Sequence, residues 1–313
     1  MKEMEKSGYQ FDNQNFKLEE HYVKKFQKHG FVKIKGFLNS DAIAFLKNRT
    51  NNEMTNVHFK ELTSRIKYEL QNEKQKMCEL VTSRAFRTLL LGITGKELFF
   101  AFDLALELEK NKSKGFPWHV GVQSFAVQML EDFGCTIWVP LDRISVEEQA
   151  GGIACVSKTV LSGEFIYEKI EPALISTLEN KEKHGIKTTL DDYYFLRQGV
   201  LNSPALTEIL EYHKIEEDYE VGDVLLFDKN VIHRSSMLKE GPLEKRAAIA
   251  IRFMDVSSRF NKKQALNIDY PAKKYGAKLS SQIQNQIKLS HGESFLNSEY
   301  FDNLDKRVLK SIP

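Results

Sequence analysis

From Glu97 onward the sequence is a succession of short apolar or alternating runs, and this pattern limits the folds that the chain can adopt. Polar turns, several with Gly or Asp, separate the runs, and each run has the length of a strand. Many short strands in one chain of 313 residues are typical of a β-sandwich, jelly roll or barrel. The runs are Leu98–Leu108, Phe125–Leu130, Cys135–Leu141, Gly152–Val156, Val224–Phe227 and Ala247–Met254.

The segment before this β-rich part is predicted to combine helices with one strand. Residues 17–29 carry apolar positions at helical spacing, and Gly30 is a favourable C-cap. Residues 31–38 begin with the alternation of a strand. A Ser-Asp pair at 40–41 predicts the start of a second helix, and residues 58–92 are expected to be mostly helical.

No internal repeat or low-complexity linker divides the chain, so we expect a single domain over residues 17–279. A flexible tail, 1–16, precedes it, and a polar, partly helical extension, 280–313, follows it. The strand pattern stops between about 160 and 220, which predicts a helical insertion. The insertion is either a lid over a site, with the aromatic triplet 193–195 against a substrate, or a set of surface helices packed on a sheet.

Composition excludes several classes of function. Lys and Arg number 45 against 43 Asp and Glu, a net charge of +2, which does not provide the basic surface of a nucleic-acid-binding domain. No apolar run approaches the roughly 18 residues that span a bilayer, and no apolar leader is visible. The three cysteines have neither disulfide nor metal spacing. We therefore expect a cytoplasmic protein that binds neither membrane nor nucleic acid, while its oligomeric state stays open.

Two of the eight histidines occupy positions suited to a site built on strands. His119 precedes one predicted strand, and His233 follows another after a short turn. Arg246 opens the next apolar run, thirteen residues after His233. Two neutral imidazoles on neighbouring strands can bind one metal ion, and an arginine on the next strand can bind a carboxylate beside that ion.

Five sequence blocks, with a sixth at the start of the chain, resemble the phytanoyl-CoA dioxygenase superfamily of Fe(II)/2-oxoglutarate oxygenases. The resemblance implies a mainly β, double-stranded β-helix core (a cupin-like jelly roll) with flanking and inserted helices. The succession of strand-like runs predicts the same class independently. The resemblance to this superfamily also implies Fe(II), 2-oxoglutarate and O2 as cofactor and co-substrates. The blocks are FPWHVG (116–121), GCTIWVPLD (134–142), GG (151–152), GDVLLFDKNVIHRSS (222–236) and KRAAIAIRF (245–253), with FQKHGFVKIKGFL (26–38) ahead of them.

The same resemblance implies roles for individual residues. His119 and His233 match the two iron-ligating histidines, and Arg246 matches the arginine that pairs with the far carboxylate of 2-oxoglutarate. Arg252, six residues further along the same run, is the alternative to Arg246. Trp138 and Ser235 match positions that line the co-substrate pocket. Trp138 is equally suited to packing in the core.

The family pattern His-x-Asp is broken at Gly121, and no carboxylate follows closer than Glu131. The missing carboxylate is the anionic third arm of the facial triad that binds iron. A halide ion carries the same charge, and glycine leaves the volume of the absent side chain. Non-haem iron halogenases show this replacement, so the resemblance implies a halogenase with Gly121 as a catalytic position and chloride beside the iron.

Three other interpretations are open. Glu131 or Asp132 supplies the carboxylate from elsewhere, or iron bound by two histidines and water supports hydroxylation, or the fold is a catalytically degenerate binding module. The expected substrate of an enzyme of this class is a small molecule that is free, nucleotide-linked or tethered to a carrier protein. The sequence carries no motif of a metalloprotease, a phosphate-binding loop or a serine hydrolase.

Overall fold

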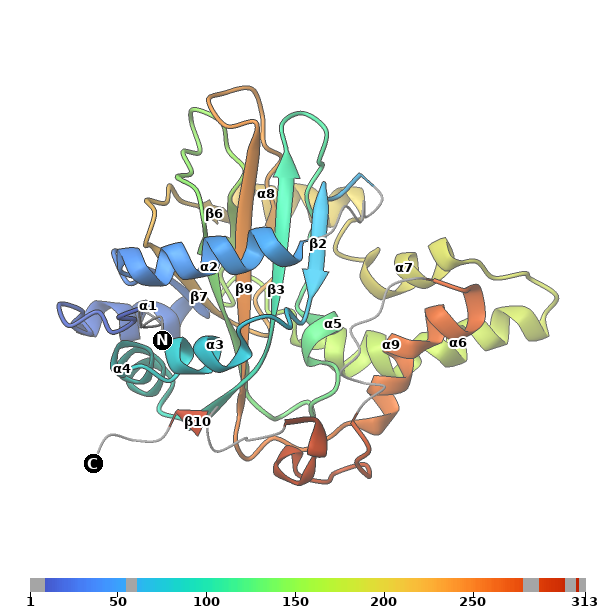
Figure 1. The fold of residues 1–313 in the computed structure, drawn as a ribbon. Coiled ribbons are helices and arrows are strands. Elements are labelled where there is room, and N and C mark those ends of the chain that lie inside the picture. The colour runs from blue at the N-terminus through green and yellow to red at the C-terminus, as the bar shows by residue number, and fades with distance from the viewer. Residues whose placement is uncertain (1–8, 55–60, 278–286, 302–307, 310–313) are drawn as a thin grey trace, which may run out of the picture.

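The structure is a computed structural model that describes residues 9–54, 61–277, 287–301 and 308–309 (Figure 1). Over these residues the strands form two antiparallel sheets, a larger one of order β1-β7-β4-β9-β3-β10 with β2 also paired to β3, and a smaller one of order β6-β5-β8. The strands are β1 (Phe31–Ile34), β2 (Arg65–Tyr68), β3 (Leu98–Glu109), β4 (Gly134–Pro140), β5 (Ile153–Val156), β6 (Lys214–Glu216), β7 (Val224–Asp228), β8 (His233–Ser235), β9 (Lys245–Asp255) and β10 (Val308–Leu309).

Residues from both sheets share one apolar core. Ile153 and Cys155 of the smaller sheet pack with Leu106, Trp138 and Ala248 of the larger one. Side chains alternate along each strand, so the neighbouring positions of the larger sheet face the other way. This two-sheet, antiparallel architecture confirms the predicted jelly-roll class.

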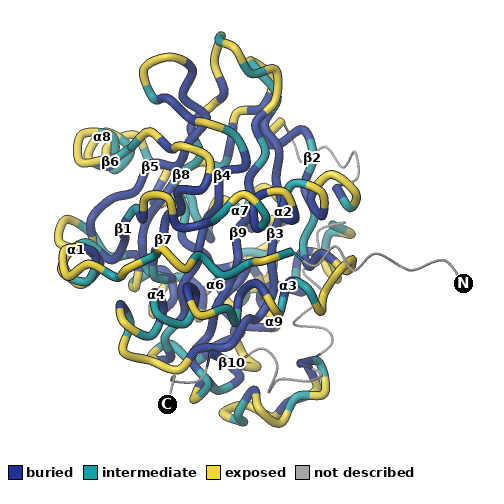
Figure 2. The backbone as a smooth tube through the Cα atoms, turned by 60° about the vertical axis from the view of Figure 1, so that its left-hand side comes forward, coloured by how far each residue is buried: buried dark blue, intermediate teal, exposed yellow. Residues whose placement is uncertain are grey.

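The outer face of the larger sheet is covered by the N-terminal helices. Ile137, Ile249 and Ile251 of the sheet share a core with Phe45 and Phe86 from these helices, and Figure 2 shows the sheet as the buried centre of the molecule. The helices are α1 (Glu20–His29), α2 (Ser40–Glu53), α3 (Lys74–Val81), α4 (Arg84–Thr94), α5 (Val122–Phe125), α6 (Glu171–Lys183), α7 (Leu190–Gln198), α8 (Pro204–His213) and α9 (Lys262–Tyr275), with a π-helical turn at Ile166–Ile170 and 3-10 turns at Phe295–Asn297 and Glu299–Phe301.

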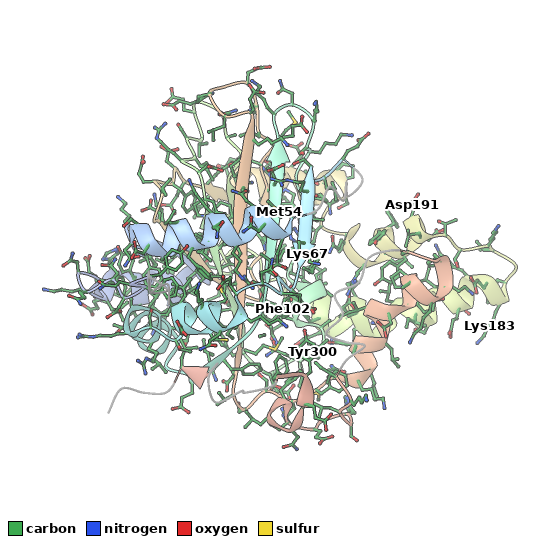
Figure 3. All side chains as sticks on the ribbon, viewed as in Figure 1. Met54, Lys67, Phe102, Lys183, Asp191 and Tyr300 are labelled. Atoms are coloured by element: carbon green, nitrogen blue, oxygen red, sulfur yellow. The ribbon has the colours of Figure 1, made fainter. Side chains whose placement is uncertain are left out.

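The segment between β5 and β6 is the predicted helical insertion. It contains α6, α7 and α8, and α6 and α7 pack with α9 beside the sheets (Figure 1). Lys183 lies near the far end of this group and Asp191 near the start of α7 (Figure 3). A buried ion pair between Arg197 of α7 and Glu171 of α6 joins the two helices, with Arg197 also donating to the Tyr193 hydroxyl at 2.8 Å.

Two local predictions were wrong. Phe125–Leu130 is not a strand, because α5 ends at Phe125 and the chain then turns. Residues 58–92 are not simply helical: β2 lies at 65–68 and pairs with Leu104–Glu107 of β3, while residues 55–60 lie outside the described residues. Predicted helix starts shift by a few residues, as with α2, whose N-cap is Asn39.

The division into tail, domain and extension stays a prediction. Within the predicted tail, the described Tyr9 and Phe11 pack against Phe45. Within the predicted extension, β10 pairs with β3 through Val308 opposite Phe99. No helix in the described part of the chain is both long enough and apolar enough to cross a membrane.

Candidate active site

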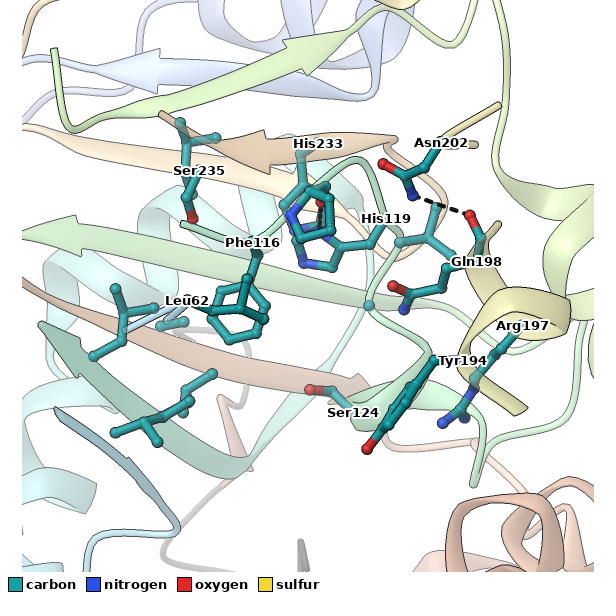
Figure 4. A pocket seen from close by; sticks show the side chains of 18 of the residues that line it. Leu62, Phe116, His119, Ser124, Tyr194, Arg197, Gln198, Asn202, His233 and Ser235 are labelled. Atoms are coloured by element: carbon teal, nitrogen blue, oxygen red, sulfur yellow. Dashed lines mark hydrogen bonds between the residues drawn. The ribbon is translucent and has the colours of Figure 1, made fainter. Parts of the chain in front are cut away.

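The two candidate iron ligands are neighbours in space. The backbone N–H of each donates to the carbonyl of the other, at 2.9 Å in both directions between His119 and His233. Their ring centroids lie 4.2 Å apart. Chain segments that are 114 residues apart in sequence therefore present two imidazoles side by side (Figure 4).

Each imidazole is oriented by a carbonyl two residues earlier in its own segment. His119 Nδ1 lies 2.8 Å from the oxygen of Pro117, and His233 Nδ1 lies 2.8 Å from the oxygen of Val231. A carbonyl only accepts, so both Nδ1 atoms carry the proton and both Nε2 atoms keep a lone pair. Burial lowers the pKa of His119 to about 4 and that of His233 well below its ordinary value. Both rings are neutral at pH 7, which is the form that binds a metal.

Gly121 follows directly and begins the turn into α5. Its φ of −69° lies outside the left-handed region that favours glycine. A Cβ at this position would lie 3.0 and 3.3 Å from two ring carbons of Phe125 and 3.8 Å from the Tyr167 hydroxyl. Packing, and not backbone conformation, is therefore the constraint on this residue.

No group of three or more His, Cys, Asp and Glu side chains in the described residues could hold a metal ion. The two nearest carboxylates after Gly121 are bonded elsewhere. Glu131 pairs with the Arg259 side chain, and Asp132 accepts the Arg259 backbone N–H at 2.5 Å. Neither residue lines the cavity at the histidines. These contacts disfavour a third ligand from this turn.

Arg246 is fully buried, and none of its three guanidinium nitrogens has a hydrogen-bond partner among the residues that the structure describes. The group lies 5.5 Å from the centroid of the Trp138 ring, and burial lowers its pKa to about 10. A buried charge without a partner is unfavourable by several kcal/mol. The arrangement therefore fits an anionic ligand, such as a carboxylate, that completes the bonding of Arg246.

Arg252 is a second buried arginine on β9 and was considered from the sequence only as an alternative to Arg246. It lines the cavity, whereas Arg246 does not. Its Nη1 donates to Thr136 Oγ1, its Nε has no partner in the described part of the chain, and its guanidinium lies 5.7 Å from the Phe125 ring centroid. Among the described residues it forms no ion pair with a carboxylate. Even spacing along a strand places both arginines on one face, a signal that was available in the sequence.

A cavity of about 460 Å³ lies in front of the histidines (Figure 4). Trp138 and Ser235 line it together with Gly121, and Trp138 also packs in the core, so both of its predicted roles are compatible with the structure. The α7 end of the cavity is more polar, with Tyr194, Arg197, Gln198 and Asn202, and these residues were not singled out individually from the sequence apart from Tyr194. The opposite wall is apolar and includes Leu62, Ile66, Leu104, Leu106 and Phe116.

The aromatic triplet of the insertion divides between the two predicted roles. Tyr193 is fully buried among the insertion helices, and its hydroxyl donates to the Asn267 carbonyl at 2.9 Å. Tyr194 and Phe195 line the cavity, and Phe195 is 70% exposed. The middle of α7 thus lies at the cavity, while Tyr193 holds the helix in place, and the role of a lid stays a prediction.

Comparison with known proteins identifies structural neighbours. No family model matches the sequence, and no curated protein matches it significantly. The non-haem α-ketoglutarate-dependent epimerase SnoN from nogalamycin biosynthesis is 14% identical, with a TM-score of 0.56 over 88% of this chain and 94% of that one. The carbocyclase SnoK of the same biosynthesis is 12% identical, with a TM-score of 0.55 over 88% and 93%.

A third neighbour is EctD from S. alaskensis, at 15% identity and a TM-score of 0.54 over 79% of this chain and 80% of that one. SnoN has been solved with Fe3+ and α-ketoglutarate, and EctD with 2-oxoglutarate and 5-hydroxyectoine. At these identities the likeness concerns the fold. The chain therefore has the fold of non-haem iron enzymes that depend on 2-oxoglutarate.

Proposed function

We propose that the protein is an Fe(II)/2-oxoglutarate-dependent enzyme that activates a C–H bond of a small molecule and transfers a halide to the carbon. The observation that carries the proposal is the pair of neutral imidazoles beside Gly121, with their Nε2 atoms free and no third protein ligand among the described residues. The fold shared with SnoN and EctD supports the class of chemistry.

The residues fit the implied cofactor and co-substrate. Nε2 of His119 and of His233 would hold Fe(II), and the unpartnered guanidinium of Arg246 would bind the far carboxylate of 2-oxoglutarate. Bound iron with 2-oxoglutarate and O2 supplies the oxidising power that removes a hydrogen atom from an unactivated carbon. The protein keeps both imidazoles neutral and correctly turned through the carbonyls of Pro117 and Val231.

Charge favours a halide as the third ligand in place of the missing carboxylate. Fe(II) and the 2-oxoglutarate dianion cancel in charge, so a facial triad adds one negative charge, and a halide adds the same. Arg252 places a buried positive charge at this cavity, held by Thr136 and without a carboxylate partner in the described chain. An anion close to this guanidinium is stabilised in the low dielectric of the interior.

The test is an anaerobic titration with Fe(II) and 2-oxoglutarate, read by the weak metal-to-ligand charge-transfer band of such complexes. Chloride and bromide should shift the band of the native protein, and the shift should disappear in Arg252→Leu while the band itself remains. If neither halide shifts the band, the result contradicts halogenation and favours hydroxylation at a two-histidine iron site. The absence of any band would favour a degenerate binding module.

A further inference from the structure

The helix after Gly121 folds its last residue back onto this glycine. The Gly121 carbonyl accepts the backbone N–H groups of Ser124 and Phe125, both at 2.9 Å. The Phe125 side chain is 1% exposed and packs directly against the Gly121 backbone. Ser124 lines the cavity, whereas Phe125 lies in the packed layer behind it.

Two glycines make room for this one ring. A Cβ at Gly121 would lie 3.0 Å from Phe125 Cδ2, and a Cβ at Gly134 would lie 2.7 Å from both Cδ1 and Cε1 of the same ring. Neither glycine has a positive φ, so neither is needed for an unusual backbone conformation. The two positions thus share one steric neighbour, the Phe125 ring, and at Gly134 the Gln128 Oε1 atom lies equally close at 2.7 Å.

The ring has little room to retreat. The Arg252 guanidinium lies 5.7 Å from its centroid, and the Tyr167 hydroxyl beyond Gly121 is fixed by donating to the Lys229 carbonyl at 3.2 Å. A side chain at position 121 would leave the backbone toward Phe125 and Tyr167, and neither of these two residues lines the cavity. A carboxylate introduced there would meet a close-packed aromatic layer before it reached the histidines.

We propose that Phe125 is the residue that fixes this site as a two-histidine centre: its ring occupies the volume that a carboxylate side chain at position 121 requires, so the third position accepts only a ligand that diffuses in. The inference rests on the proposed iron site at His119 and His233 and not on halide transfer. A single Gly121→Asp substitution therefore does not rebuild a facial triad, whereas the same substitution with a smaller residue at position 125 does.

The experiment compares the Fe(II) affinity of Phe125→Ala, Gly121→Asp and the double variant by anaerobic titration without halide, after circular dichroism and thermal unfolding have confirmed folding. We expect the double variant to bind Fe(II) at least tenfold more tightly than Phe125→Ala, and Gly121→Asp to show no gain over the native protein. If Phe125→Ala does not fold, Phe125→Leu replaces it in the single variant and in the double variant.

The matched control is Gly121→Asp combined with Phe116→Ala. Phe116 also lines the cavity, with its ring 5.7 Å from that of His119, but it is not among the atoms nearest a Cβ at Gly121. This control should show no gain in Fe(II) affinity. A tenfold gain in Gly121→Asp alone would overturn the proposal, and so would equal affinities for the double variant and Phe125→Ala. If halides do not shift the charge-transfer band of the native protein, halide transfer is refuted. The comparison of Fe(II) affinities among the variants still tests the role of Phe125.

Discussion

Arg246 and Arg252 project from the same face of β9, with two alanines of that face between them. Six residues of strand separate their Cα atoms by about 20 Å. Ala250 between them lines the cavity, so the middle of this face is left without a large side chain. The strand thus offers two separated positive charges, Arg252 at the cavity and Arg246 fully buried beyond Ala248.

We expect the two arginines to be separable by substitution. Arg246→Leu should weaken 2-oxoglutarate binding by about 2–5 kcal/mol, because a buried charge pair loses one partner. Arg246→Lys should restore the charge but not the two parallel hydrogen bonds, and so should recover only part of the affinity. Isothermal titration with Fe(II) present measures both effects. Arg252→Leu is the matched control on the same strand, and a larger loss in this variant than in Arg246→Leu would show that the roles are exchanged.

Removing either imidazole should abolish iron binding. His119→Ala and His233→Ala leave one protein ligand each, and we expect neither to give the charge-transfer band with Fe(II) and 2-oxoglutarate. His213→Ala, on the surface helix α8, should keep the band. Full band intensity in His119→Ala would contradict the assignment of this ligand.

The insertion should depend on its buried ion pair. Glu171 is fully buried and Arg197 is 2% exposed, so Glu171→Gln leaves a buried guanidinium without its anion. We expect a loss of about 3–5 kcal/mol in the free energy of unfolding, measured by urea denaturation. Glu148→Gln breaks an exposed pair with Arg143 and should change stability by less than about 1 kcal/mol. Equal losses in the free energy of unfolding of the two variants would contradict a stabilising role for the buried pair between α6 and α7.

Gly134→Ala should destabilise the protein through the Phe125 ring. The added methyl would lie 2.7 Å from two ring carbons, and overpacking of this kind costs about 1–3 kcal/mol. Phe125→Leu in the same chain should relieve part of this loss, so a double-mutant cycle should give a coupling of about 1 kcal/mol. Strict additivity of the two substitutions would argue against contact between them.

The larger elements could be predicted from the sequence because their apolar runs are long or clearly bounded. The runs at 98–108, 135–141 and 247–254 correspond to β3, β4 and β9 with small shifts at their ends. The run beginning at Phe125 was wrongly predicted to be a strand, because a short apolar run is compatible with a buried helix end as well as with a strand. β2 has the sequence RIKY, whose alternation of charged and apolar residues over four positions is a strand signal that the prediction of helix over 58–92 did not use.

The candidate site was predictable in part. His119, His233 and Arg246 were found from sequence blocks and their spacing, and the structure brings the two histidines together. The Phe125 ring at Gly121 could not be predicted, since it depends on how α5 turns and on the absence of a side chain at Gly134. The bond of Arg252 to Thr136 joins residues 116 positions apart and needs the register of β4 with β9.

The two imidazoles are each held by a carbonyl of their own segment, two residues upstream. Neither ring therefore relies on a residue at position 121 for its orientation or its tautomer. In such a scaffold an acidic third ligand can be lost, or regained once a smaller residue replaces Phe125, while the metal-binding histidines stay preorganised. Reaction outcome and metal retention can accordingly evolve as separate traits in such a fold.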